Sequence, residues 1–104
     1  MPIRFQVRLT QRAHADMDEI WTFIAHNSID EANRFIHKLE RQLKTLRRLP
    51  GRCPLIPEND LPDKQYRHLI YGNYRTVFRI SGRRTVYVVR IIHGARLLDT
   101  SMLE

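Results

Sequence analysis

The sequence lacks acidic residues over a long stretch that contains many arginines. Between Lys64 and Leu98 it contains no aspartate and no glutamate, while the whole chain of 104 residues carries 18 lysines and arginines against 11 acidic residues. The formal net charge is +7 and the sequence pI is about 10.3. A polyanion or an acidic protein is therefore the natural partner, and the alternative is a basic surface that is merely well solvated.

Cysteine and long apolar runs are also scarce. Cys53 is the only cysteine, which excludes an intramolecular disulfide and suits a reducing compartment. No apolar run approaches the ~20 residues needed to cross a bilayer, and the first residues lack the apolar core of a signal peptide. We therefore expect a cytoplasmic protein without membrane attachment, folded as one domain over residues 1–104.

Motifs that hold metals or cofactors are absent. The five histidines lack the spacing of an HExxH motif, and one cysteine cannot build a zinc cage. There is no phosphate-binding glycine loop and no motif for a serine or cysteine nucleophile. We expect no metal and no cofactor.

The first part of the chain predicts a strand and a helix. Residues 3–9 alternate apolar and polar side chains, as a half-buried strand does. Apolar residues then recur at three- and four-residue spacing over 11–26, which predicts an amphipathic helix with Thr10 as its cap. Trp21 lies in this apolar stripe, either as a core residue or as an anchor for a partner.

A second helix follows. Ser28 and Glu31 have the spacing of a capping box, and Pro50-Gly51 stops the helix. Its apolar residues line one face: Ala32, Phe35, Ile36, Leu39, Leu43 and Leu46. The two helices form a hairpin, and the proline-rich residues 51–64 form a loop that can fold over the sheet.

The rest of the chain predicts three antiparallel strands. Tyr71 and Tyr74 flank Gly72-Asn73, two residues that tolerate the positive φ angles of a tight turn. A second turn at 81–84 leads into residues 85–93, which are dense in valine, isoleucine and tyrosine. The expected order is β-α-α-β-β-β, an α+β domain with an antiparallel sheet and a helical hairpin packed on one face.

Strand alternation sorts the side chains of the first hairpin into two faces. Counting outward from the turn pairs Ile70 with Arg75 and His68 with Val77. We expect one face to be core: Leu69, Tyr71, Tyr74, Thr76, Phe78 and Ile80. We expect the other face to be an exposed basic and aromatic working surface: Tyr66, His68, Ile70, Arg75, Val77 and Arg79.

Arginine, histidine and tyrosine on such a surface can grip phosphates and stack on bases. They can also stabilise the extra charge of a phosphorane during attack by a 2′-hydroxyl, without a metal. His68 could act as an acid or a base because an unperturbed histidine titrates near physiological pH. The alternative is that Arg75 and Arg79 only keep an open sheet face soluble.

Two segments, RHLIYGNYRTVFRI and VYVVRIIHGARLL, resemble the RelE/ParE superfamily, the toxins of bacterial type II toxin–antitoxin modules. The expected β-α-α-β-β-β order matches that fold, so the resemblance covers essentially the whole chain. RelE-like members are ribosome-dependent endoribonucleases that cut mRNA, whereas ParE-like members are similar in fold and poison DNA gyrase.

For a RelE-like ribonuclease, the resemblance implies His68, Arg75 and Arg96 as catalytic residues. The two lysines of that catalytic set fall on Tyr66 and His68, the hairpin arginine is Arg75, and a later arginine corresponds to Arg96. The C-terminal tyrosine of the set falls near Met102 and is missing. The pattern is therefore damaged where proton transfer would occur.

The sequence Arg90-Ile91-Ile92-His93 resembles the end of the last strand in ParE-like members, and the tail after Arg96 leaves little room for a catalytic C-terminal helix. We therefore favour a toxin that binds gyrase over one that acts on the ribosome and mRNA. The resemblance also implies a cognate acidic antitoxin, bound along the helical hairpin and the open sheet in a hetero-oligomer. The residues expected to contact target or antitoxin are Tyr66, Arg75, Arg79, Arg90, His93 and Arg96.

Overall fold

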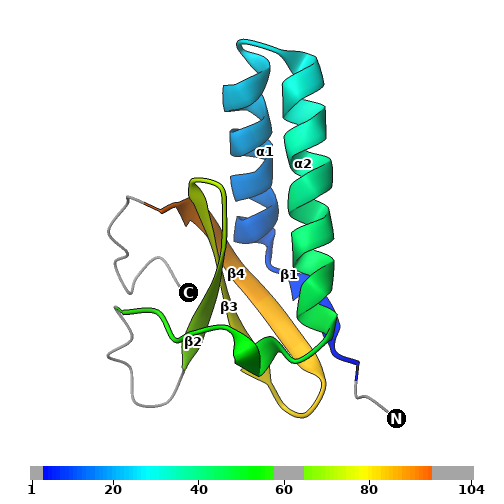
Figure 1. Ribbon diagram of the computed structural model, residues 1–104, viewed down its shortest axis with the longest axis vertical. Coiled ribbons are helices and arrows are strands. Elements are labelled where there is room, and N and C mark those ends of the chain that lie inside the picture. Colours follow the sequence, from blue (N-terminus) through cyan, green and yellow to red (C-terminus); the bar gives the residue numbers. More distant parts are fainter. Residues whose placement is uncertain (1–3, 58–64, 95–104) are drawn as a thin grey trace.

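A computed structural model describes residues 4–57 and 65–94 of the chain, and there a helical hairpin packs on a four-stranded sheet (Figure 1). The main elements are β1 (Gln6–Leu9), α1 (Gln11–Ala25), α2 (Ile29–Lys44), β2 (Tyr66–Tyr71), β3 (Tyr74–Ser81) and β4 (Thr85–His93). Two short 3-10 helices, η1 (Thr45–Arg47) and η2 (Pro50–Arg52), follow α2. The expected element order and the α+β class are confirmed.

The sheet has the strand order β1-β4-β3-β2. Strands β2, β3 and β4 pair antiparallel, but β1 lies parallel to β4, with Val7 opposite Val86. The structure thus refines the expected antiparallel sheet to a mixed one. The alternation of residues in a strand indicates which face is buried, but it carries no information on the direction of the neighbouring strand.

The register of the first hairpin agrees with the count from its turn. Tyr71 pairs with Tyr74, and Ile70 pairs with Arg75. Gly72 supplies the positive φ, 58°, that the two-residue turn requires. The assignment of side chains to the two faces of β2 and β3 is therefore correct.

The expected helix caps are also in place. The backbone N–H of Ala13 donates to Thr10 Oγ1 at 3.1 Å, and that of Glu31 donates to Ser28 Oγ at 3.1 Å. Thr10 Oγ1 in turn donates to the carbonyl of Val89 at 3.1 Å. The same hydroxyl therefore caps the N-terminus of α1 and connects α1 to β4.

The main core lies between the helical hairpin and one face of the sheet. The expected apolar face of α2 and the expected core face of the β2–β3 hairpin meet there, with Leu39 and Phe78 fully buried. The turn between α1 and α2 projects beyond the sheet (Figure 1). Among the described residues, no helix is long and apolar enough to span a membrane.

The opposite face of the sheet is filled, although the sequence predicted it to be open. Tyr66 and Val77 are 1% and 0% exposed, and Arg75 is 7% exposed. A second apolar cluster occupies this face: Ile56, Tyr66, Val77, Val89 and Ile92. The prediction of an exposed working surface is therefore wrong at Tyr66, Val77 and Arg75, while Ile70 at the turn end remains 62% exposed.

The chain that precedes β2 helps to fill this face. The N–H of Ile56 donates to the carbonyl of Tyr66 at 3.0 Å, and the N–H of His68 donates to the carbonyl of Pro54 at 3.1 Å. Residues 54–56 thus run along β2 like a short extra strand. This brings Ile56 under the sheet, and it confirms for part of the proline-rich segment that it folds onto the sheet.

Candidate functional site

A β-bulge in β4 decides where Arg90 points. Val77 of β3 pairs with Arg90, whereas Phe78 pairs with Val88, so Val89 is the extra residue. Val89 and Ile92 pack in the cluster on the far face, and the two residues between them face the helices. Bulges redirect side chains in this way because they interrupt the alternation of the strand.

Arg90 is held by Asp16 of α1 in a buried ion pair. Nε of Arg90 donates to Asp16 Oδ2 at 2.8 Å, and Nη2 donates to Oδ1 at 3.1 Å. The N–H of Ile91 also donates to Oδ2, at 2.9 Å. The two charged residues are 4% and 5% exposed, so this bidentate pair fastens α1 to β4 and leaves little surface for a partner.

Two other predicted residues make aromatic contacts. The ring of His93 meets that of Tyr74 edge-on, with 5.5 Å between centroids, on the side of the helices. The guanidinium of Arg79 lies 4.9 Å from the ring centroid of Tyr87 on the far face. Both contacts fix the direction of a polar side chain, as cation–π and edge-to-face pairs do.

The predicted site residues therefore divide between the two sides of the sheet. Tyr66, His68, Arg75 and Arg79 share the far face of β2 and β3. Arg90 and His93 lie toward the helices. Arg96, and the position near Met102, lie outside the described residues.

A fixed arginine also anchors the chain before β2. Arg67 Nη1 donates to the carbonyl of Cys53 at 2.6 Å and to that of Gly51 at 3.2 Å. Burial raises the pKa of the Cys53 thiol above its usual value, and the nearby charges of Arg52 and Arg67 act in the opposite direction. Arg67 thus joins Arg90 as an arginine of the sheet with a structural role.

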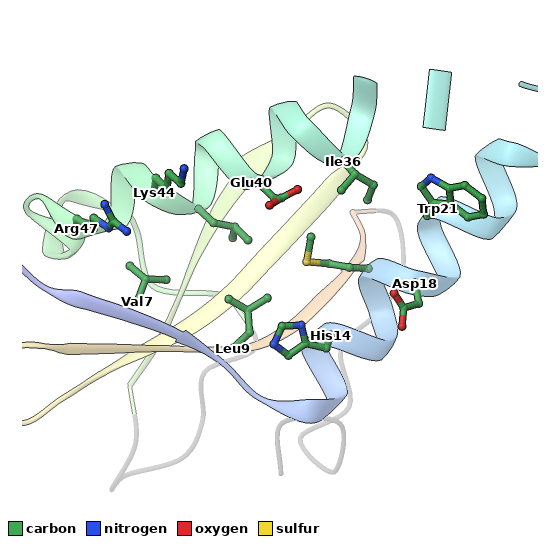
Figure 2. Close-up of a pocket in the computed structure, with 11 residues that line it drawn as sticks. Val7, Leu9, His14, Asp18, Trp21, Ile36, Glu40, Lys44 and Arg47 are labelled. Atoms are coloured by element: carbon green, nitrogen blue, oxygen red, sulfur yellow. The ribbon is translucent and has the colours of Figure 1, made fainter. Parts of the chain in front are cut away.

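A groove runs between β1 and the two helices (Figure 2). It has a volume of about 410 Å³. Apolar side chains line most of it: Val7, Leu9, Met17, Trp21, Ile36 and Leu43. Charged and polar residues complete the lining: His14, Asp18, Glu40, Lys44 and Arg47. An apolar hollow with a polar rim is the usual form of a surface that binds a segment of another protein.

Trp21 lies at one end of this groove and Arg47 at the other (Figure 2). The indole Nε1 of Trp21 donates to Asn33 Oδ1 of α2 at 2.9 Å, which fixes the ring across the helical hairpin. The side chain is half-buried, and its role as an anchor for a partner stays a prediction. It packs within the hairpin and also offers a face to the groove.

Strand β1 borders the groove and forms the edge of the sheet. Within residues 4–57 and 65–94 it pairs only with β4. An edge strand beside an apolar groove can accept both backbone hydrogen bonds and side chains from a partner. Sequence reasoning missed this groove, and its only signal was the apolar stripe that contains Trp21.

Three comparisons with known proteins point to the same family. The family model described as ParE toxin of type II toxin-antitoxin system, parDE, matches residues 7–98. The chain is 28% identical over 87 residues to Toxin ParE1 of Caulobacter vibrioides, which covers 83% of this chain and 85% of that protein. It is also similar to a solved chain from the chromosomal ParDE TA system from P. aeruginosa, with a TM-score of 0.68 and 20% identity. That similarity covers 86% of this chain and 96% of the other, and at this identity it shows a shared fold.

Proposed function

Because this chain belongs to the ParE toxin family of type II toxin–antitoxin systems, we propose that it stops bacterial growth by binding DNA gyrase in the cytoplasm. A cognate acidic antitoxin neutralises it by forming a hetero-oligomer. The ParE-like part of the superfamily is the part associated with gyrase, and the family match supports that target. The proposed inhibitor acts by binding and carries out no reaction of its own.

The observation that carries the choice of a binding toxin over a nuclease is the filled far face of the sheet. A ribonuclease of the RelE type would present Tyr66, His68 and Arg75 to RNA. Tyr66 is 1% exposed and Arg75 is 7% exposed, and the apolar residues Val77 and Ile92 lie among them. A guanidinium that is covered in this way offers little surface to a phosphate, so this face supports nuclease chemistry poorly.

Gyrase inhibition can be measured directly. Relaxed plasmid, gyrase and ATP are incubated with the purified toxin, and supercoiled and cleaved plasmid are separated on a gel. We expect supercoiling to fall and cleaved plasmid to accumulate as toxin is added, and we expect antitoxin to reverse both effects. Supercoiling that continues unchanged at saturating toxin would remove gyrase as the target.

The groove between β1 and the helices supports a binding site for the antitoxin. It offers apolar side chains, an edge strand and a basic end at Lys44 and Arg47. An extended acidic segment can add to the edge of the sheet, place apolar side chains in the groove and set carboxylates against the basic end. Partly disordered antitoxin segments bind in this manner because they order on contact.

Trp21 and Phe23 provide a matched test of this placement, since both are aromatic residues of α1 and only Trp21 lines the groove. Trp21→Ala should weaken antitoxin binding by about 2 kcal/mol, roughly thirtyfold, as expected for an aromatic anchor. Phe23→Ala, at a side chain that is 74% exposed, should change affinity little. Calorimetric titration gives both values, and a larger loss at Phe23 would place the antitoxin elsewhere on α1.

A ribonuclease is the second candidate, and one observation favours it. His68 and Arg75 lie on the same face of the β2–β3 hairpin, where a base and a phosphate-binding cation would be needed. His68→Ala should abolish RNA cleavage because it removes proton transfer, whereas it should only weaken a toxin that binds. Arg75→Ala should impair both activities, so His68 is the variant that separates them.

A further inference from the structure

The end of α2 carries more positive charge than the proposed function uses, since the antitoxin site assigns only Lys44 and Arg47. A concavity beside η1 and η2 is lined by six basic residues: Arg4, Arg41, Lys44, Arg47, Arg48 and Arg52. Thr45 and Leu49 complete the lining, and no carboxylate is among the residues that line it. We refer to this concavity as the cationic pocket.

Backbone hydrogen bonds bring separate segments together in the cationic pocket. The N–H of Phe5 donates to the carbonyl of Arg47 at 2.8 Å, which holds the chain before β1 against η1 and places Arg4 in the pocket. The N–H of Gln6 donates to the carbonyl of Arg84 at 2.6 Å. The turn between β3 and β4, with its adjacent arginines, therefore lies at the same end of the molecule (Figure 1).

Arg52 is held in place before any ligand arrives. Its Nη1 donates to the carbonyl of Arg48 at 2.8 Å and to that of Leu49 at 3.2 Å. Its Nη2 donates to Thr45 Oγ1 at 3.1 Å. A guanidinium that is already ordered loses less side-chain entropy when it binds an anion.

Helix stabilisation accounts for only part of this charge. A cation in the last turn of a helix stabilises it by about 0.3–1 kcal/mol through the helix dipole, and the effect ends within that turn. This explains Arg41 and Lys44, which lie in the last turn of α2. It does not explain Arg4 or Arg48, which lie outside α2. Among the described residues, no ion pair joins a residue of the pocket to a carboxylate.

We propose that the cationic pocket binds the backbone phosphates of a nucleic-acid duplex, without regard to base sequence. Five of its six cations are arginines, whose planar forks match phosphate oxygens in pairs. Its charges come from several segments and extend toward the β3–β4 turn, which suits a polymer with regularly spaced phosphates better than a single small anion.

An acidic protein segment fits the cationic pocket less well. Protein interfaces have an apolar centre, and the lining of this pocket offers a single apolar side chain, Leu49, which is 75% exposed. The apolar groove beside it has the character of a protein-binding surface. The two surfaces thus have different ligands: the groove binds a protein segment, and the cationic pocket binds a phosphate backbone. If gyrase is the target, the pocket would hold the toxin on the DNA that gyrase binds.

Two matched double variants test the proposal. Arg41→Ala with Arg48→Ala removes two charges from the pocket, and neither residue lines the groove. Arg34→Ala with Lys38→Ala removes two charges from exposed positions of α2 outside the pocket. Binding of purified toxin to a short fluorescent DNA duplex is followed by anisotropy at several salt concentrations, with an RNA duplex of the same sequence in parallel.

The pocket variant should bind DNA at least tenfold more weakly. Its plot of log affinity against log salt should be shallower by about 1–2, since each lost phosphate contact removes about 0.9 from the slope. The control variant should change little. Equal affinity for DNA and RNA would identify the phosphates, which both duplexes carry, as the ligand. A preference for one duplex would show which nucleic acid the pocket binds.

Two results would overturn the proposal. Equal losses in both variants would mean that net charge alone attracts DNA. Normal DNA binding by the pocket variant, with weakened antitoxin binding, would assign the pocket to an acidic protein. Because gyrase is absent from this assay, its outcome is independent of the plasmid supercoiling result.

Discussion

The arginines of this protein occupy two contrasting regions. In the sheet, Arg90 is 4% exposed and paired with Asp16, and Arg75 is 7% exposed beside the apolar cluster of the far face. At the end of α2, Arg41, Arg47 and Arg48 are exposed around a hollow without carboxylates. The same side chain therefore fastens the fold in one region and offers charge to a partner in the other.

The difference teaches that local charge density does not identify a binding surface. The stretch without acid from residue 64 to 98 was expected to bind a partner. Four of its arginines are instead buried or held by contacts within the fold: Arg67, Arg75, Arg79 and Arg90. Five of the six cations of the pocket come from a second, shorter stretch without acid, residues 41–57. The hydrogen bond from the N–H of Phe5 to the carbonyl of Arg47 adds the sixth, Arg4, from the start of the chain.

The largest effect should follow from breaking the buried pair. Asp16→Ala leaves Arg90 buried without its carboxylate, and we expect the free energy of unfolding to fall by about 3–5 kcal/mol. Urea unfolding followed by circular dichroism measures this change. Asp18→Ala, two residues along α1 at an exposed position, should change stability by no more than about 0.5 kcal/mol.

A second variant keeps this prediction testable if Asp16→Ala fails to fold. Replacing both partners, Asp16→Leu with Arg90→Met, removes both buried charges and should recover much of the lost stability. If the single and the double variants are equally unstable, the fall in the free energy of unfolding does not come from the unpaired charge of Arg90. Shape at the junction of α1 and β4 would then be the cause.

The packing that covers Arg75 should give the next largest effect. Ile92, which pairs with Arg75 and is 3% exposed, belongs to the cluster on the far face. Ile92→Ala should lower the free energy of unfolding by about 2–4 kcal/mol, as a buried large-to-small change does.

Ile70 is the matched control, because it faces the same side of the sheet and is 62% exposed. Ile70→Ala should change stability by about 0.5 kcal/mol or less. Thermal unfolding of Ile92→Ala and Ile70→Ala measures both changes in stability. Equal, small effects would mean that the far face is open along its whole length, as the sequence had suggested.

Local signals predicted the local features of this fold well. The capping hydroxyls, the apolar faces of both helices and the register around Gly72 follow from residues that are close in sequence, and the structure agrees at each. Features that join distant residues were not predictable in this way. The pairing of β1 with β4, the bulge at Val89 and the strand-like residues 54–56 each depend on contacts across the chain.

These long-range contacts are also the ones that set the candidate sites. The bulge turns Arg90 from a candidate contact into a core residue, and the extra strand puts Ile56 under the working surface that alternation had outlined. The groove and the cationic pocket both form where β1 meets the helices. A single sequence contains no periodicity that marks such a junction.

The smallest effect on stability should come from the backbone of Leu49, in the exposed region at the end of α2. Leu49 has φ 47° and ψ 55° at the start of η2, in the left-handed region where glycine is usual. Leu49→Gly should raise the free energy of unfolding by up to about 1 kcal/mol, since it relieves this strain. Leu49→Ala keeps the Cβ and should bring no gain. A stabilised alanine variant would show that exposure of the leucine, and not its backbone, is what destabilises the protein.

The proposed inhibition of gyrase is tested most directly by brief induction of this protein in a bacterium that lacks the antitoxin. Incorporation of labelled thymidine and of labelled methionine is followed in parallel. We predict that thymidine incorporation fails first, together with a DNA-damage response, while methionine incorporation continues. If methionine incorporation fails first and mRNA ends appear within codons, the protein is a ribonuclease and the gyrase account is wrong.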